Sequence, residues 1–238
     1  EELALHTGLR AGRVRLAAFP SALGTFVPQA AAAFAADHPA VELRFTAAEP
    51  PDAARLLRAG EVEVALGFSY PGRPDATGAP GAAGASRPAG PPADDDSLRH
   101  EPLLTEPTYL VTPAGLTGDT LRDHADRPWI GGCERCRTNL VRACADAGFT
   151  PDLAYTTDDY VAVQALVAVG LGVTTLPGLA LAAHRHPGVR TVRLPGQDRH
   201  VTATLYATPP DPPTAALLTH LRAAAGAAFD VPAADTRS

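Results

Sequence analysis

Strands and helices alternate at short spacing over the first 70 residues, and this order restricts the fold more than any other feature of the sequence. Three segments have the apolar pattern of strands: residues 13–18, 41–47 and 62–67. Two segments between them have helical periodicity or helix-end residues: 23–34 and 51–59. Strands joined by helices at this spacing predict a parallel sheet with helices against its faces.

A second series of strands and helices occupies the later part of the chain. The predicted strands are residues 107–112, 129–131, 153–156 and 173–176, and the predicted helices are 135–147 and 159–169. A strand at 201–206 and an Ala-rich helix at 212–229 complete the pattern. The sequence therefore predicts a two-lobed α/β body.

A Pro/Gly-rich tract separates the two series. Residues 71–92 contain five Gly and six Pro and few large apolar side chains that could anchor them in a core. Such composition predicts a disordered insertion or linker, and limited proteolysis is expected to cut it first, near Arg73 or Arg87.

The charge and the cysteine content limit the partners and the compartment. The 26 acidic residues outnumber the 20 basic ones, and the basic residues are scattered, so we expect this segment not to bind DNA by itself. No segment approaches the roughly 18 consecutive apolar residues of a membrane-spanning helix. For that reason no membrane partner is expected. Three cysteines cannot all pair within one chain, which favours a reducing cytoplasm.

Cys133 and Cys136 form a C-x-x-C motif at the predicted start of a helix. A helix N-terminus favours a thiolate, so the motif fits redox chemistry or metal binding. Cys144 follows Cys136 by eight residues, about 12 Å along a helix, too far to share a zinc ion. Cys136, Leu140 and Cys144 recur every four residues, so the alternative is that both cysteines are core residues while Cys133 is exposed.

No catalytic set is recognisable in the sequence. Ser69 lies in a G-x-S-x-P segment that lacks the second Gly of a nucleophile elbow, and a loop residue is the better interpretation. The pair His184 and His186 has neither Cys nor carboxylate nearby, so a solvated turn is expected. Gly170 and Gly172 precede a strand, which excludes a dinucleotide fingerprint. We expect no enzyme activity, cofactor or metal.

Small polar groups follow the predicted strands. In open parallel sheets, ligands bind beyond the carboxyl ends of the strands, where helix N-termini offer amide donors. The candidate ligand-binding residues at these positions are Ser21, Ala22, Glu49, Phe68, Ser69, Gly132, Cys133, Arg137, Thr157, Asp158 and Pro177. Ser21 and Thr157 are also expected to be N-caps of helices. These positions predict a small-molecule cleft between the lobes.

Three stretches, taken together in order, resemble the effector-binding region of LysR-type transcriptional regulators. They are LRAGRVRLAA at residues 9–18, LLRAGEVEVALG at 56–67 and VQALVAVGLGVTTLP at 163–177. The resemblance extends from about Leu9 to Phe229. It implies an α/β fold of two Rossmann-like subdomains with the periplasmic-binding-protein-like (type II) architecture.

The resemblance also implies a division of the chain. Subdomain I comprises residues 9–68 and 201–230, and subdomain II comprises 101–200, with crossings near 67–69 and 195–201. The Pro/Gly/Ala-rich insertion at residues 69–100 departs from the family pattern and is expected to be disordered. Residues 1–8 are expected to be the end of a linker helix and 231–238 a disordered tail.

The function implied by the resemblance is effector sensing. Members of the family bind a small metabolite between the lobes, which modulates a DNA-bound dimer or tetramer and transcription in the cytoplasm. Their winged helix-turn-helix is expected outside this chain, and the stretch Ala30 to Ala33 is a candidate dimer contact. Arg137 would pair with an anionic effector, a carboxylate above all, or alternatively make only a surface contact.

Two other classes of function compete with this interpretation. A solute-binding protein of a transporter shares the fold but requires export, which the cysteines do not favour. A thiol-dependent enzyme would use Cys133 as its nucleophile.

Overall fold

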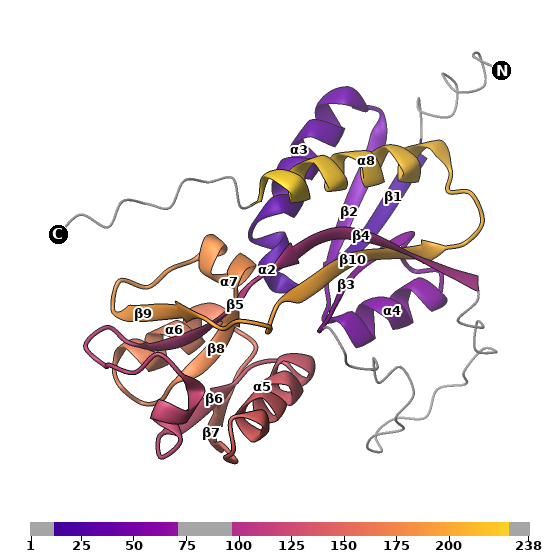
Figure 1. Ribbon diagram of the computed structural model, residues 1–238. Coiled ribbons are helices and arrows are strands. Elements are labelled where there is room, and N and C mark those ends of the chain that lie inside the picture. Colours follow the sequence, from indigo (N-terminus) through magenta and orange to yellow (C-terminus); the bar gives the residue numbers. More distant parts are fainter. Residues whose placement is uncertain (1–11, 71–96, 229–238) are drawn as a thin grey trace. The chain divides into compact units, whose positions relative to one another are not determined.

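The structure is a computed structural model that describes residues 12–70 and 97–228 (Figure 1). The chain divides into a first unit, residues 1–104 with 201–238, and a second unit, residues 105–200. The predicted linker end at 1–8, the tract at 71–92 and the tail at 231–238 lie outside the described residues.

The first unit is built on a five-stranded sheet with the order β2-β1-β3-β10-β4. Its strands are β1 (Gly12–Ala18), β2 (Val41–Ala47), β3 (Val64–Ser69), β4 (Leu98–Glu106) and β10 (Arg199–Tyr206). Its helices are α2 (Pro20–Leu23), α3 (Phe26–Asp37), α4 (Pro50–Arg58) and α8 (Pro212–Ala227). Strand β1 pairs in parallel with β2 and β3, as the alternation of strands and helices predicted.

Helices cover both faces of this sheet. Helices α3 and α8 pack side by side on one face (Figure 1). Helix α4 packs on the other face, where Ala53 and Leu57 lie in one cluster with Ala17 and Ala65. The short side chains of Ala17 and Ala65 let α4 approach the strands closely, which places its N-terminus at the carboxyl ends of β1 and β3.

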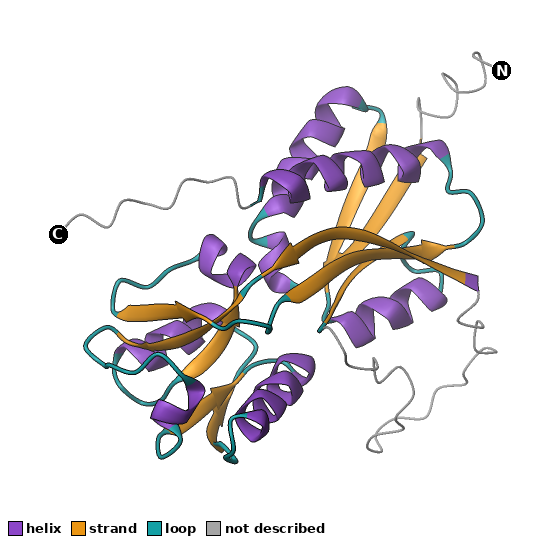
Figure 2. Ribbon diagram, in the orientation of Figure 1, coloured by secondary structure: helices purple, strands orange, loops and turns teal. Residues whose placement is uncertain are grey.

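The second unit contains two small sheets (Figure 2). Strands β5 (Thr108–Pro113), β8 (Thr174–Pro177) and β9 (Val189–Arg193) form one antiparallel sheet, and β6 (Pro128–Gly131) pairs in parallel with β7 (Asp152–Thr156). A parallel bridge between Trp129 and Val173 joins β6 to the segment that leads into β8. The helices are η2 (Leu121–His124), α5 (Glu134–Asp146), α6 (Tyr160–Ala168) and α7 (Gly178–Ala183).

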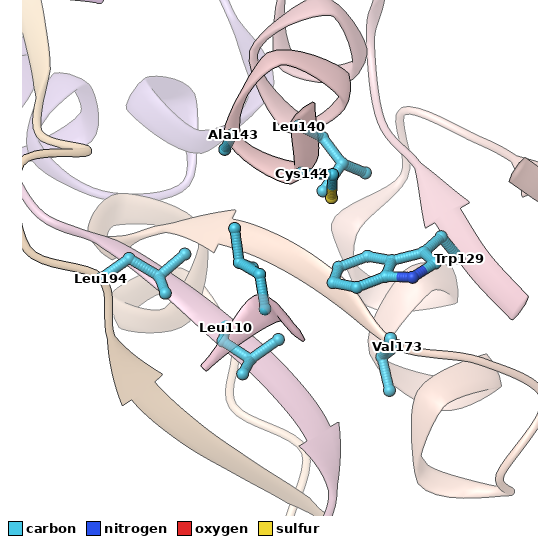
Figure 3. Close-up of a cluster of buried hydrophobic side chains, with 8 residues drawn as sticks. Leu110, Trp129, Leu140, Ala143, Cys144, Val173 and Leu194 are labelled. Atoms are coloured by element: carbon cyan, nitrogen blue, oxygen red, sulfur yellow. The ribbon is translucent and has the colours of Figure 1, made fainter. Parts of the chain in front are cut away.

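The core of the second unit lies on both faces of β5. Leu110 belongs to a cluster with Trp129, Leu140 and Cys144, and the last two point from α5 toward the strands (Figure 3). Val111, on the opposite face of β5, belongs to a second cluster that α6 and α7 cover. Alternating residues of one strand thus anchor helices on both sides.

Strand β4 corrects the prediction for residues 98–100, which were assigned to the disordered insertion. Leu98 is buried, His100 Nδ1 lies 2.9 Å from Thr204 Oγ1, and Ala207 N donates to Ser97 O. These partners lie in β10 or directly after it, so a strand forms where the local sequence is polar. The first crossing between the units therefore follows Leu104, later than the predicted 67–69.

Other elements also differ from the prediction. Strand β9, η2 and α7 were not predicted, and the first predicted helix is divided at Gly24 and Thr25 into α2 and α3. Among the described residues, no helix is long and apolar enough to cross a membrane.

Candidate functional site

The candidate residues of the first unit lie together at one edge of its sheet. The parallel register pairs Ala18 with Ala47, and Ala48 N donates to Ala18 O at 3.0 Å, so β1 and β2 end side by side. The residues that follow β1 and β2, or lie at the end of β3, are Ser21, Ala22, Glu49, Phe68 and Ser69. The ring of Phe68 packs edge-to-face on that of Phe19, with centroids 5.1 Å apart.

Ser21 does not cap a helix, contrary to the prediction. Phe19 is the N-cap of α2, and its carbonyl accepts from Ala22 N and Leu23 N. Ser21 is a buried residue within α2, and its own carbonyl accepts from Thr25 Oγ1 at 2.6 Å. The helix begins at Pro20, so Ser21 lies inside its first turn and not at the capping position before it.

The candidate residues of the second unit gather in the same way. Strands β6 and β7 are parallel, and Thr157 N donates to Gly131 O at 3.0 Å. Gly132 and Cys133 therefore lie beside Thr157 and Asp158 at the carboxyl edge. Pro177 ends β8, which is joined to β6 through the bridge that precedes it, and is the N-cap of α7.

Three helix N-termini follow these strands, and two of them are capped by a carboxylate. Asp159 caps α6 by accepting from Val161 N at 2.9 Å and Ala162 N at 3.3 Å. The prediction that Thr157 is the N-cap is therefore wrong. Its side chain instead accepts a hydrogen bond from Asp159 N. On α7, Leu179 N donates to Glu106 Oε2 at 2.7 Å.

Helix α5 differs from these two neighbours. Its N-cap, Cys133, makes no capping hydrogen bond with its side chain. The first amides of a 13-residue helix carry the positive end of its dipole, and an anion can bind there. Helix α5 thus begins without the side-chain N-cap that Asp159 provides for α6.

Arg137 adds a cation one turn into α5. Its backbone N donates to Cys133 O at 2.8 Å, and its side-chain stem crosses Gly131, where an added Cβ would lie 3.4 Å from Arg137 Cγ and Cδ. The side chain is half-buried and makes no ion pair among the described residues. Among the charged residues of the first turn of α5, Arg135 and Arg137 outnumber Glu134.

The cysteines separate into two environments. Cys133 Sγ donates to Cys136 Sγ at 3.0 Å, and both side chains are half-buried. Cys144 is fully buried, and burial raises the pKa of its thiol to about 12. The core interpretation is confirmed for Cys144, whereas Cys136 faces Cys133. Within the described parts of the chain, no group of three or more His, Cys, Asp or Glu side chains could hold a metal ion.

Glu106 and Arg199 form a buried ion pair that the sequence did not predict. Arg199 Nε donates to Glu106 Oε1 at 2.6 Å, and both side chains are almost fully buried. Burial raises the pKa of the Glu106 carboxyl, while the Arg199 guanidinium and the Leu179 amide oppose this effect. The pair fixes the start of α7 to the ends of β4 and β10. Its sequence signal was a lone Glu and a lone Arg, each shortly before an expected strand.

Comparison with known structures identifies the class of fold. An effector-binding domain of BenM with its effector benzoate matches with a TM-score of 0.70 at 14% identity, over 94% of this chain and 96% of that one. Full-length CbnR in complex with its target DNA matches with a TM-score of 0.65 at 20% identity, over 94% and 77%. The chain therefore has the periplasmic-binding-protein-like type II fold of these domains.

Comparison of the amino-acid sequence with known families and proteins identifies the family of this chain. The LysR substrate binding domain family matches residues 7–80 and 88–230, and the chain belongs to this family. A Bacillus subtilis (strain 168) protein described as the uncharacterized HTH-type transcriptional regulator YcgK is 26% identical over 196 residues. That alignment covers 71% of this chain and 53% of the relative, so the chain spans about half the length of the curated relative it matches.

Proposed function

We propose that this chain senses a small anionic metabolite, most favourably a carboxylate, for a LysR-type transcriptional regulator. The observation that carries the proposal is the N-terminus of α5, where Cys133 makes no side-chain cap and Arg137 lies one turn away. The neighbouring α6 and α7 use Asp159 and Glu106 as their caps. A carboxylate on an effector would take the same role for α5.

The energetics favour an anion at this position. The helix dipole contributes about 0.3 to 1 kcal/mol to a charge at its N-terminus. A charge-assisted hydrogen bond from Arg137 contributes roughly 1.5 to 3 kcal/mol. Because Gly131 has no side chain, the Arg137 stem lies against the strand, which reduces the entropy that its guanidinium loses on binding.

The remaining candidate residues complete the proposed effector contacts. They are Gly132, Thr157, Asp158 and Pro177 in the second unit and Ser21, Ala22, Glu49, Phe68 and Ser69 in the first. We propose that each set contributes to effector binding, because each lies at the carboxyl ends of the strands of its own unit. The effector named for the BenM domain, benzoate, is a carboxylate, which supports the proposed ligand class.

The proposed regulation requires partners beyond this chain. We propose that effector binding modulates a DNA-bound homo-oligomer, a dimer or tetramer, in the cytoplasm, and that DNA contacts come from a winged helix-turn-helix. The CbnR structure, which contains target DNA, and the HTH-type relative support this proposal. The family match favours a regulator over the solute-binding protein and the thiol-dependent enzyme.

A thermal-shift screen tests the proposal. Carboxylate metabolites are compared with neutral and cationic compounds of similar size. A ligand at 100 times its Kd should stabilise the fold by about 2.7 kcal/mol. Arg137→Ala should weaken a carboxylate hit by roughly 10-fold or more, whereas Arg142→Ala, an exposed arginine further along α5, is the matched control and should not. Hits that are all neutral or cationic, or equal affinities for the two variants, would refute the anion site.

A further inference from the structure

The C-x-x-C motif places two thiols in contact at the start of α5. Cys133 is the N-cap and Cys136 lies in the first turn, with their sulfur atoms 3.0 Å apart. A disulfide bond is about 2.05 Å long, so side-chain rotations that bring the sulfurs closer by about 1 Å would suffice. Both side chains are half-buried, so a small oxidant can reach them.

We propose that Cys133 and Cys136 form a reversible dithiol–disulfide couple that hydroperoxides oxidise. One thiol attacks an oxygen of hydrogen peroxide, the O–O bond breaks, and a sulfenic acid and one water form. The second thiol attacks the sulfenic sulfur, the S–S bond forms, and its proton leaves with the hydroxyl group as a second water. The thiols lose two electrons and two protons, and the peroxide is reduced to two waters.

The environment of the third cysteine makes this oxidation selective. Cys144 is fully buried in the cluster with Leu140 and Trp129, and its thiol keeps a pKa of about 12 (Figure 3). The thiolate is the reactive form, so Cys144 should neither reach the oxidant nor react with it. Two thiolates would also be too few ligands for a tetrahedral metal site, and no third ligand of the His, Cys, Asp or Glu type joins the pair in the described region.

Mass spectrometry tests the couple directly, because trypsin cleaves after Arg135, between the two cysteines. The purified chain is reduced, freed of reductant, treated with hydrogen peroxide, alkylated in denaturant and digested. We expect two of the three thiols to be lost and the peptide that ends at Arg135 to be joined to the dipeptide Cys136–Arg137. Dithiothreitol should restore all three thiols.

Single variants distinguish the couple from unspecific oxidation. Cys133→Ser and Cys136→Ser should each abolish the linked peptide, and a sulfenic-acid probe should label the cysteine that remains. Cys144→Ala should leave the linkage unchanged. The proposal fails if all three thiols stay alkylatable, if Cys144 enters the disulfide, or if the linkage joins two chains. Because the assay contains no effector, its result tests the dithiol–disulfide couple independently of the proposed ligand site.

Discussion

Replacing Glu106 by Gln should destabilise the protein far more than any change to a surface ion pair. The carboxylate accepts from Arg199 Nε at 2.6 Å and from Leu179 N at 2.7 Å, and it is completely buried. Gln keeps the shape but deprives the buried guanidinium of its carboxylate. Breaking a buried pair costs about 3 to 5 kcal/mol, which for a chain of this size lowers Tm by roughly 6 to 20 °C.

The assay is urea unfolding followed by the fluorescence of Trp129, the single tryptophan, which is buried in the same unit. Glu42→Gln is the control, because Glu42 pairs with Arg13 on the surface and its loss should have only a small effect. If Glu106→Gln does not fold, the double variant Glu106→Leu with Arg199→Met should restore much of the stability, since two apolar residues remove both buried charges. The importance of the buried pair would be refuted if Glu106→Gln lowered the free energy of unfolding by less than about 1 kcal/mol. It would also be refuted if the double variant were no more stable than Glu106→Gln.

Three further predictions concern the second unit. The pKa of Asp123 is lowered by hydrogen bonds from Thr120, so its stabilising effect is present above the ordinary aspartate pKa and is lost as the pH falls through the lowered value. Wild type should therefore exceed Asp123→Asn in unfolding free energy at neutral pH, and the difference should vanish in acid; a constant difference across the titration would contradict this. Cys144 should resist iodoacetamide in the folded chain and react only in denaturant, as peptide mapping would show; rapid native labelling would contradict its burial. Leu140→Ala should cost about 2 to 5 kcal/mol in urea unfolding, because it leaves a cavity beside Trp129; an exposed alanine substitution, Arg142→Ala, should cost far less.

The sequence predicted those elements whose signals are local. Residues 41–47 alternate apolar and polar side chains, and β2 has these same bounds. The helix expected at 135–147 differs from α5 by one residue at each end, because its apolar face and the Gly148 turn are both encoded locally. The three family-like stretches then identified the fold, since their order and spacing are specific although each stretch is degenerate.

Features that depend on distant partners were not predictable in this way. Strand β4 is polar at Arg99, Glu101 and Thr105 and forms because β10, about a hundred residues later, supplies its hydrogen bonds. The pairing of Glu106 with Arg199 spans 93 residues. No local pattern distinguishes these two residues from exposed charges at strand ends.

Capping of the helices shows a similar limit at the candidate site. The sequence predicted Thr157 as the cap of α6, whereas the structure places Asp159, two residues later, in that role. For α7 the cap comes from Glu106, far away in the chain. The contrast that sets α5 apart from its neighbours is therefore a property of the fold, while the candidate residues around it were predicted from the strand ends.

Hydrogen–deuterium exchange with the strongest carboxylate hit tests the central claim most directly. The account predicts slower exchange of the amides from Glu134 to Arg137 when the ligand is bound, because the ligand carboxylate accepts from the start of α5. Helix α8 (Pro212–Ala227), which contains none of the proposed contact residues, should exchange as before. Protection of α8 without protection of the α5 N-terminus, or unchanged exchange at saturating ligand, would contradict the proposed effector site.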